Sequence, residues 1–195
     1  MSDEKSKKIL IHEYVSKKIG YLTECKDNSD GKATLARLRR GIGKTPGEIP
    51  ELWGIFLNEL PERLTSNNGI PTSAEWAVYI SMTLFAMHQQ GKSDKVHSAG
   101  ISFGKAVAGL MDENSDGERV RIMRRFAPII TAKDMPEFSH HMRCMIQLLR
   151  TKDNIRLDYA KLAEDIYDFQ YEESRKKVQL RWGQDFYYTE KEKGE

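Results

Sequence analysis

Basic side chains are gathered into clusters along this chain, and clustered guanidinium and ammonium groups are the means by which proteins hold phosphates. Residues 32–44 (KATLARLRRGIGK) carry five positive charges and no negative charge, although the net charge of all 195 residues is only +2. A near-neutral protein that segregates its cations in this way presents a positively charged surface to an anionic partner. The alternative interpretation is that each cluster is an ordinary solvated helix face.

Three more clusters follow, at residues 119–125, 143–150 and 175–181. Arginine grips phosphate oxygens whatever base is attached, so the clusters favour contacts to a nucleic-acid backbone over base recognition. Aromatic residues that could stack on bases are scarce outside predicted core positions, and Tyr187 and Tyr188 are the best exposed candidates. The candidate nucleic-acid-binding residues are Arg37, Arg39, Arg40, Lys44, Lys105, Arg121, Arg124, Arg125, Arg143, Arg150, Arg175, Lys177 and Arg181.

No arrangement of residues predicts a catalytic, metal or cofactor site. Residues 43–45 (GKT) resemble the end of a P-loop, but the motif's earlier glycine is absent and no strand precedes them. The adjacent His140 and His141 diverge on a helix and cannot bind one metal together. Asp165 and Asp168 lie one turn apart in an acid-rich segment, which we interpret as a solvated face rather than a two-metal centre. We therefore expect a protein that is not an enzyme.

Composition and the chain's first residues indicate a compartment. The 39% apolar and 31% charged content is typical of a helical protein with a real core and a large polar surface. No apolar segment reaches the roughly 18 residues that a membrane span requires, and the polar start lacks a secretion signal. Cys25 and Cys144 are far apart and in no metal-ligand spacing. These features predict a location in the reducing cytoplasm.

Apolar residues recur every three to four positions in nearly every ordered segment, which predicts an all-α protein, a helical bundle that can form two packed subdomains. The polar loop at residues 112–117 (DENSDG) suggests a division into residues 1–112 and residues 113–195. Capping-box residues predict helix starts at Thr45, for a helix that ends before Pro61, and at Thr72. We also expect close helix contact at Gly104.

The helical period also predicts which side chains point outward. At ~100° per residue, Arg37 and Arg40 project away from the apolar stripe of their helix. Two further outward rows are predicted: Arg121, Arg124 and Arg125 in the first, and His140, Arg143, Gln147 and Arg150 in the second. The last helix is predicted to bury Tyr171, Val178, Trp182 and Phe186 and to expose Lys177 and Arg181. The binding hypothesis requires these rows to merge into one continuous track.

Several segments resemble a known family. They are SAGISFGKAVAGL at residues 98–110, the Arg124–Arg125–Phe126 step, LARLRRGIGKTPGE at residues 35–48, and three runs between residues 138 and 188, namely FSHHMRCMIQLLR, LDYAKLAEDIYDFQ and RKKVQLRWGQDFYY. Together they resemble the CasB family, the small helical subunit of type I-E CRISPR Cascade complexes. The resemblance covers most of the chain from about residue 35 to residue 188. The Trp182–Gly183 ending with Asp185 and Phe186 is its most specific part.

The resemblance implies a non-enzymatic subunit in antiviral defence. Two copies would lie head to tail in the RNA-guided complex, contact its other protein subunits, and stabilise the R-loop formed by guide crRNA and target DNA. The basic face would hold the displaced non-target strand and lie beside the guide–target duplex. The positions that match the family pattern are Arg39, Arg40, Lys105, Arg124, Arg125, Arg143, Arg175, Lys177 and Arg181. Arg121 and Arg150 rest on the helical projection alone.

Two other functions stay open on the sequence. Residues 37–44 and the capped helix expected after them loosely imitate a helix-turn-helix, which would suit a sequence-specific DNA-binding regulator. That second helix is poor in base-reading arginine, asparagine and glutamine, which counts against this function. The other alternative is a helical adaptor whose arginines bind acidic faces of partner proteins.

Overall fold

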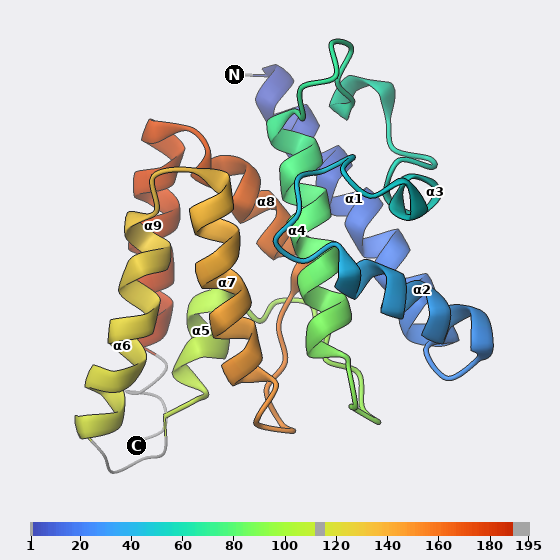
Figure 1. Cartoon of the computed structure of the whole chain (residues 1–195). Helices are drawn as coiled ribbons and strands as arrows, with labels where there is room; N and C mark the ends of the chain where they lie inside the picture. The colour runs from blue at the N-terminus through green and yellow to red at the C-terminus, as the bar shows by residue number, and fades with distance from the viewer. Residues whose placement is uncertain (1, 112–115, 189–195) are drawn as a thin grey trace.

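The computed structural model describes residues 2–111 and 116–188, and it builds them from nine α-helices and two short 3-10 helices, η1 and η2, with no strand (Figure 1). The all-α prediction is therefore confirmed. In chain order the elements are α1 (Ser2–Cys25), α2 (Ser29–Arg40), η1 (Pro50–Leu52), α3 (Trp53–Phe56), η2 (Glu62–Leu64), α4 (Ser73–His88), α5 (Phe103–Ala108), α6 (Asp116–Thr131), α7 (Met135–Leu149), α8 (Tyr159–Phe169) and α9 (Glu172–Tyr188).

Helix α4 is the centre of the bundle. It is buried on almost every side and packs against α1, α2, α7 and α8 (Figure 1). Its predicted start is confirmed, because the Thr72 side chain accepts from the Glu75 amide and the Glu75 carboxylate accepts from the Thr72 amide. Such reciprocal caps satisfy two amides that have no partner inside the helix. A helix that is apolar all round needs this enclosure by neighbours.

Helices α5 and α9 pack closely because α5 carries a glycine at the contact. A Cβ atom built on Gly104 would lie 2.3 Å from the carbonyl oxygen of Trp182 and 2.8 Å from the Cβ of Asp185. Beside it, the ring centroids of Phe103 and Trp182 lie 4.9 Å apart in an edge-to-face arrangement. The expected close approach at Gly104 is thus confirmed, and its partner is the backbone of α9.

Substitution Gly104→Ala is expected to lower the free energy of unfolding by about 1–3 kcal/mol, because α5 must move away from a rigid backbone and not from a flexible side chain. Gly183→Ala is the matched control on α9, since no atom lies within 4 Å of a Cβ atom built there. Alanine in a helix interior should stabilise that site by about 0.5–1 kcal/mol. Urea unfolding of both variants measures the difference, and equal stabilities would contradict the close-contact account.

The long helix predicted from Thr45 to before Pro61 is wrong. At its predicted start the chain forms a non-helical turn, in which the Glu48 amide donates to the Thr45 carbonyl at 3.0 Å. Gly47 then adopts a φ of +88°, which helical backbone does not permit. Pro50 disfavours the helical conformation at Ile49, which is extended, and only η1 and the four-residue α3 follow.

The proposed division into two halves stays a prediction. Most of the boundary loop at residues 112–117 lies outside the described residues. One hydrophobic core includes side chains from both sides of it, such as Ile11 and Phe85 before the loop and Phe126 and Trp182 after it. None of the described helices has both the length and the apolar character that a membrane span requires.

Candidate nucleic-acid interface

Six predicted binding residues are exposed and form no ion pair with any described carboxylate. They are Arg37 on α2, Lys105 on α5, Arg124 and Arg125 on α6, Arg143 on α7 and Lys177 on α9. Helices α6 and α7 pack directly against each other, so Arg124, Arg125 and Arg143 come from neighbouring helices. We call these three residues the α6–α7 basic surface. Their charges are available to an external anion without breaking an internal pair.

Three other predicted cations are exposed but paired. Arg40 contacts Glu51 at 2.9 Å, Lys44 contacts Glu48 at 2.7 Å, and Arg121 contacts Glu118 at 2.9 Å. Exposed ion pairs contribute about 0–1 kcal/mol, because water screens both charges and two long side chains lose freedom. A phosphate can therefore replace the carboxylate at little cost.

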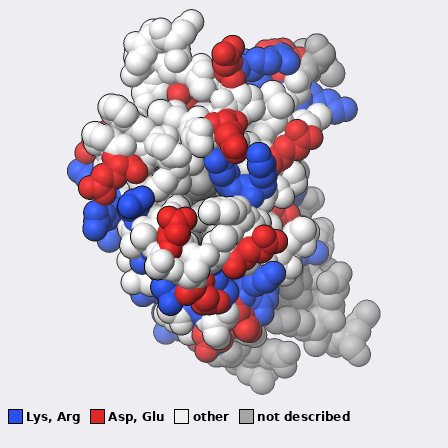
Figure 2. Space-filling model, turned by 90° about the vertical axis from the view of Figure 1, so that its right-hand side faces the viewer, with Lys and Arg blue, Asp and Glu red and all other residues white. Residues whose placement is uncertain are grey.

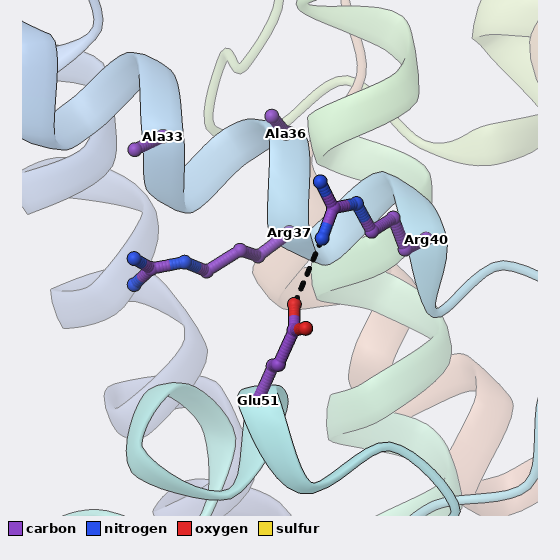
Figure 3. Close-up of a pocket in the computed structure, with 5 residues that line it drawn as sticks. All are labelled: Ala33, Ala36, Arg37, Arg40 and Glu51. Carbon is purple, nitrogen blue, oxygen red and sulfur yellow. Dashed lines mark hydrogen bonds and ion pairs between the residues drawn. The ribbon is translucent and has the colours of Figure 1, made fainter.

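The first basic cluster lines an open pocket of about 540 Å³ between α2 and the η1 segment. Ala33 and Ala36 leave room along α2, and Arg37, Arg40 and Glu51 supply its charges. Figure 3 shows the Arg40 guanidinium directed at the Glu51 carboxylate, whereas the Arg37 guanidinium points away from both. Arg37 is thus the cation of this pocket that no described carboxylate neutralises.

Arg175 is engaged inside the fold. Its Nε donates to the carbonyl of Phe169 at 2.7 Å, and its guanidinium lies 4.6 Å from the centre of the Phe169 ring. A further N–H reaches the carbonyl of Ala132 at 3.5 Å. Arg175 therefore satisfies carbonyl groups at the ends of α8 and α6, a structural task that occupies the side chain.

Arg181 does not project freely into solvent, contrary to the helical projection. Its Nη2 contacts Oδ1 of Asp165 at 2.5 Å, and the Trp182 indole donates to Oδ2 of the same carboxylate at 2.7 Å. Asp165 is only 1% exposed, and burial raises its pKa, although the Arg181 and Lys161 charges act in the opposite direction. The guanidinium, together with the Lys161 ammonium at 3.5 Å, compensates the charge of this buried carboxylate.

The prediction that the acid-rich segment is a solvated face is therefore wrong. Asp165 is buried, and Asp168 pairs with Lys8 of α1 at 3.0 Å. Glu164 likewise accepts from His12 of α1 at 2.6 Å and from Lys161 at 2.7 Å. These carboxylates join α8 to α1 and α9. Among the described residues, no three His, Cys, Asp or Glu side chains converge in a way that could hold a metal ion.

The projection of the last helix also fails at Tyr171, which is 39% exposed, although Val178, Trp182 and Phe186 are fully buried as predicted. Tyr187 and Tyr188 are exposed as predicted. Since Tyr171 precedes the first residue of α9, the period of that helix does not govern its direction.

Arg39 and Arg150 are brought together from distant parts of the sequence. Both are half-buried, and both donate to groups at the C-terminal end of α4: Arg39 to the carbonyl of Ala86 and Arg150 to the side chain of Gln90. Lys92 and Arg156 lie in the two loops beside them, and the sequence analysis missed both. Each has an aspartate within three residues, Asp94 after Lys92 and Asp153 before Arg156, so neither belongs to a cluster of cations alone.

The basic rows do not form one uninterrupted track. Helices α2 and α6 lie at opposite edges of the molecule, and α7 lies between them (Figure 1). Figure 2 shows the face of the molecule on which α1, α2 and α3 lie, and there lysine and arginine (blue) alternate with aspartate and glutamate (red). Continuity between α2 and α7 is instead provided at the end of α4 by Arg39 and Arg150.

These features define a small all-α protein that displays several uncompensated arginines on neighbouring helices. The family model for CRISPR-associated protein Cse2 matches residues 34–187, and the chain belongs to this family. The resemblance to the CasB family is thereby confirmed.

Solved structures agree with this assignment. The crystal structure of CasB from Thermobifida fusca is 31% identical, with a TM-score of 0.75 over 91% of this chain and 97% of that chain. CasB from M. ruber, at 23% identity, has a TM-score of 0.65 over 91% and 96% of the two chains and shows the shared fold. CasB from Thermus thermophilus, at 18% identity, also has a TM-score of 0.65, over 89% and 97%. No curated protein sequence matches the chain.

Proposed function

We propose that this protein is a non-catalytic, nucleic-acid-binding subunit of a type I-E CRISPR Cascade complex. In this proposal it holds the displaced non-target DNA strand and the region beside the guide–target duplex, and so stabilises the R-loop. Its partners are the other Cascade subunits, a second copy of itself, guide crRNA and target DNA. Family membership supports the assembly, and the α6–α7 basic surface supports the contact to nucleic acid.

The observation that carries the proposal is the absence of described carboxylate partners around Arg124, Arg125 and Arg143. Three exposed guanidinium groups on two adjacent helices give this part of the surface a positive potential that attracts an external anion. Formation of an R-loop is nearly balanced in free energy, because one duplex replaces another. Modest contacts to a freed strand can therefore shift that equilibrium without any base recognition.

The structure argues against the alternative of a sequence-specific regulator. A helix-turn-helix needs a second helix long enough to enter the major groove, and this chain has only η1 and the four-residue α3 at that place. A protein-binding adaptor would differ in its behaviour, since its arginines would matter for partner retention rather than for nucleic acid.

In the triple variant Arg124→Gln, Arg125→Gln, Arg143→Gln, we expect the binding of an oligothymidylate to depend less on salt. The slope of log affinity against log salt should be smaller in magnitude by about 2 than in the wild type. Each lost phosphate contact on a single strand lowers the slope of log affinity against log salt by about 0.7. Fluorescence anisotropy from 50 to 200 mM salt measures it. The control variant Lys17→Gln, Arg63→Gln, Lys176→Gln removes equal charge from exposed cations that are not among the candidate binding residues, and it should keep the wild-type slope.

Assembly of the same triple variant into the complex separates the two functions. If the subunit is retained while R-loop lifetime falls, the surface acts on nucleic acid. Loss of the subunit from complexes without target DNA would instead indicate the adaptor and contradict the proposal.

A further inference from the structure

Two guanidinium groups are anchored within one turn at the C-terminal end of α4. Nη1 of Arg39 donates to the carbonyl oxygen of Ala86 at 3.4 Å, and Nη1 of Arg150 donates to Oε1 of Gln90 at 2.8 Å. Ala86 lies in the last turn of α4 and Gln90 lies two residues beyond its end, so both anchors belong to the same end of the helix. The arginines themselves come from the end of α2 and from the residue after α7.

The end of α4 is suited to hold these cations in place. The Gln90 amide donates to Met87 at 3.2 Å, and this leaves the Ala86 carbonyl to Arg39. The last carbonyl groups of a helix have no partner in the helix and carry its partial negative charge, which favours guanidinium groups there. One of the five N–H groups of each guanidinium serves as the anchor, and the others are left for a ligand.

No described carboxylate neutralises either arginine. Burial, followed by the charge of Arg150, lowers the pKa of Arg39, as expected for a partly buried cation with a second cation nearby. The nearby carboxylates are already used, because Asp94 pairs with Arg156 at 3.3 Å and Asp153 pairs with Lys92. Neither of these two carboxylates is therefore left to neutralise Arg39 or Arg150.

The histidine that lies between Ala86 and Gln90 in the chain supplies no negative charge either. His88, the last residue of α4, is fully buried, and its Nε2 has no hydrogen-bond partner among the described residues. Its Nδ1 lies 2.9 Å from the hydroxyl of the buried Tyr159. Two positive charges near each other without a counter-charge raise the free energy of the unliganded protein. An external anion bound between them removes that cost.

We propose that Arg39 and Arg150 together grip a single phosphate group of a nucleic-acid strand. This Arg39–Arg150 clamp rests on the proposed function, because it assigns one phosphate of the same strand to a defined place. Two guanidinium groups can chelate one phosphate through several charge-assisted hydrogen bonds. The strand would then pass from the α6–α7 basic surface along α7 to the end of α2, which bridges the gap between the basic rows.

The test compares Arg39→Gln, Arg150→Gln and the double variant in the oligothymidylate assay with the full chain. If both arginines share one phosphate, each single variant lowers the salt slope by about 0.7 and the double variant lowers it by the same amount. A decrease of about 1.4 in the double variant would show two separate contacts, and no decrease would show none. Either result overturns the clamp. The control Arg63→Gln removes an exposed arginine that pairs with Asp3 and should leave the slope unchanged.

A second arm uses inorganic phosphate and identifies the source of the ligand. At a phosphate concentration about five times Kd, the melting temperature of the wild type should rise by about 2–4 °C over chloride at equal ionic strength. Neither single variant should show this rise, and oligothymidylate should compete for the site. Stabilisation by phosphate without competition would assign the site to free phosphate and overturn the strand clamp.

The two arms also separate this inference from the proposed function. Wild-type binding with unchanged slopes in the variants contradicts the clamp alone. Failure of the wild type to bind oligothymidylate contradicts the proposed function, and with it the assignment of the clamp to a strand. Melting of each variant in chloride measures any structural effect of losing the Ala86 or Gln90 contact.

Discussion

Replacement of Asp165 by alanine is expected to destabilise the protein by about 1–3 kcal/mol, the usual cost of leaving a buried hydrogen-bond donor without its acceptor. The carboxylate is 1% exposed and accepts from Arg181 at 2.5 Å and from the Trp182 indole at 2.7 Å, and Lys161 lies 3.5 Å away. Alanine leaves all three donors without this acceptor. The Trp182 N–H is affected most, because that side chain is fully buried and water cannot replace the carboxylate.

Urea unfolding followed by circular dichroism measures this loss, and two variants give it context. Asp165→Asn keeps an acceptor for Trp182 but removes the charge, so its loss should be smaller than that of alanine. Asp153→Ala removes an ion-paired carboxylate that is 95% exposed and should leave the stability close to that of the wild type. If Asp165→Ala were as stable as Asp153→Ala, the network would not hold α8 to α9.

Local signals in the sequence predicted most helices and some of their contacts. The Thr72 cap acts on its own helix end, and Gly104 acts by lacking a side chain. The start of α4 and the close helix contact could therefore be predicted without knowing the rest of the fold. The capping residues at Thr45 predicted a helix that does not continue. There Gly47 and Pro50 favour a turn and an extended residue, and these backbone preferences outweigh the cap.

The candidate interface was less predictable, because pairing depends on residues that are distant in sequence. A helical projection correctly places Arg124, Arg125 and Arg143 outside. It cannot show that Asp165 of α8 captures Arg181, because the partner belongs to another helix. The meeting of Arg39 with Arg150 is also invisible in a projection, since it requires α2, α4 and α7 to end at one place.

Protonation of His88 is expected to weaken the fold by about 3 kcal/mol between pH 6.5 and pH 4. Burial, followed by the charges of Lys92, Arg150 and Arg156, lowers the pKa of His88 from 6.5 to about 4. Between pH 6.5 and pH 4 the His88 imidazole is protonated in the unfolded chain but stays neutral in the folded protein. Stability therefore falls as the pH is lowered through this window, and each pKa unit corresponds to about 1.36 kcal/mol.

The variant His88→Gln isolates this contribution, because glutamine can bond Tyr159 but does not titrate. Urea unfolding of wild type and variant at intervals from pH 7 to pH 4 gives the difference in stability at each pH. That difference should shift by about 3 kcal/mol in favour of the variant as the pH falls, while other groups titrate equally in both proteins and cancel. A constant difference would show that His88 accepts a proton in the folded state. Burial and the positive charges at the end of α4 would then not lower the pKa of His88. That result would contradict the excess of positive charge inferred at this end of the helix.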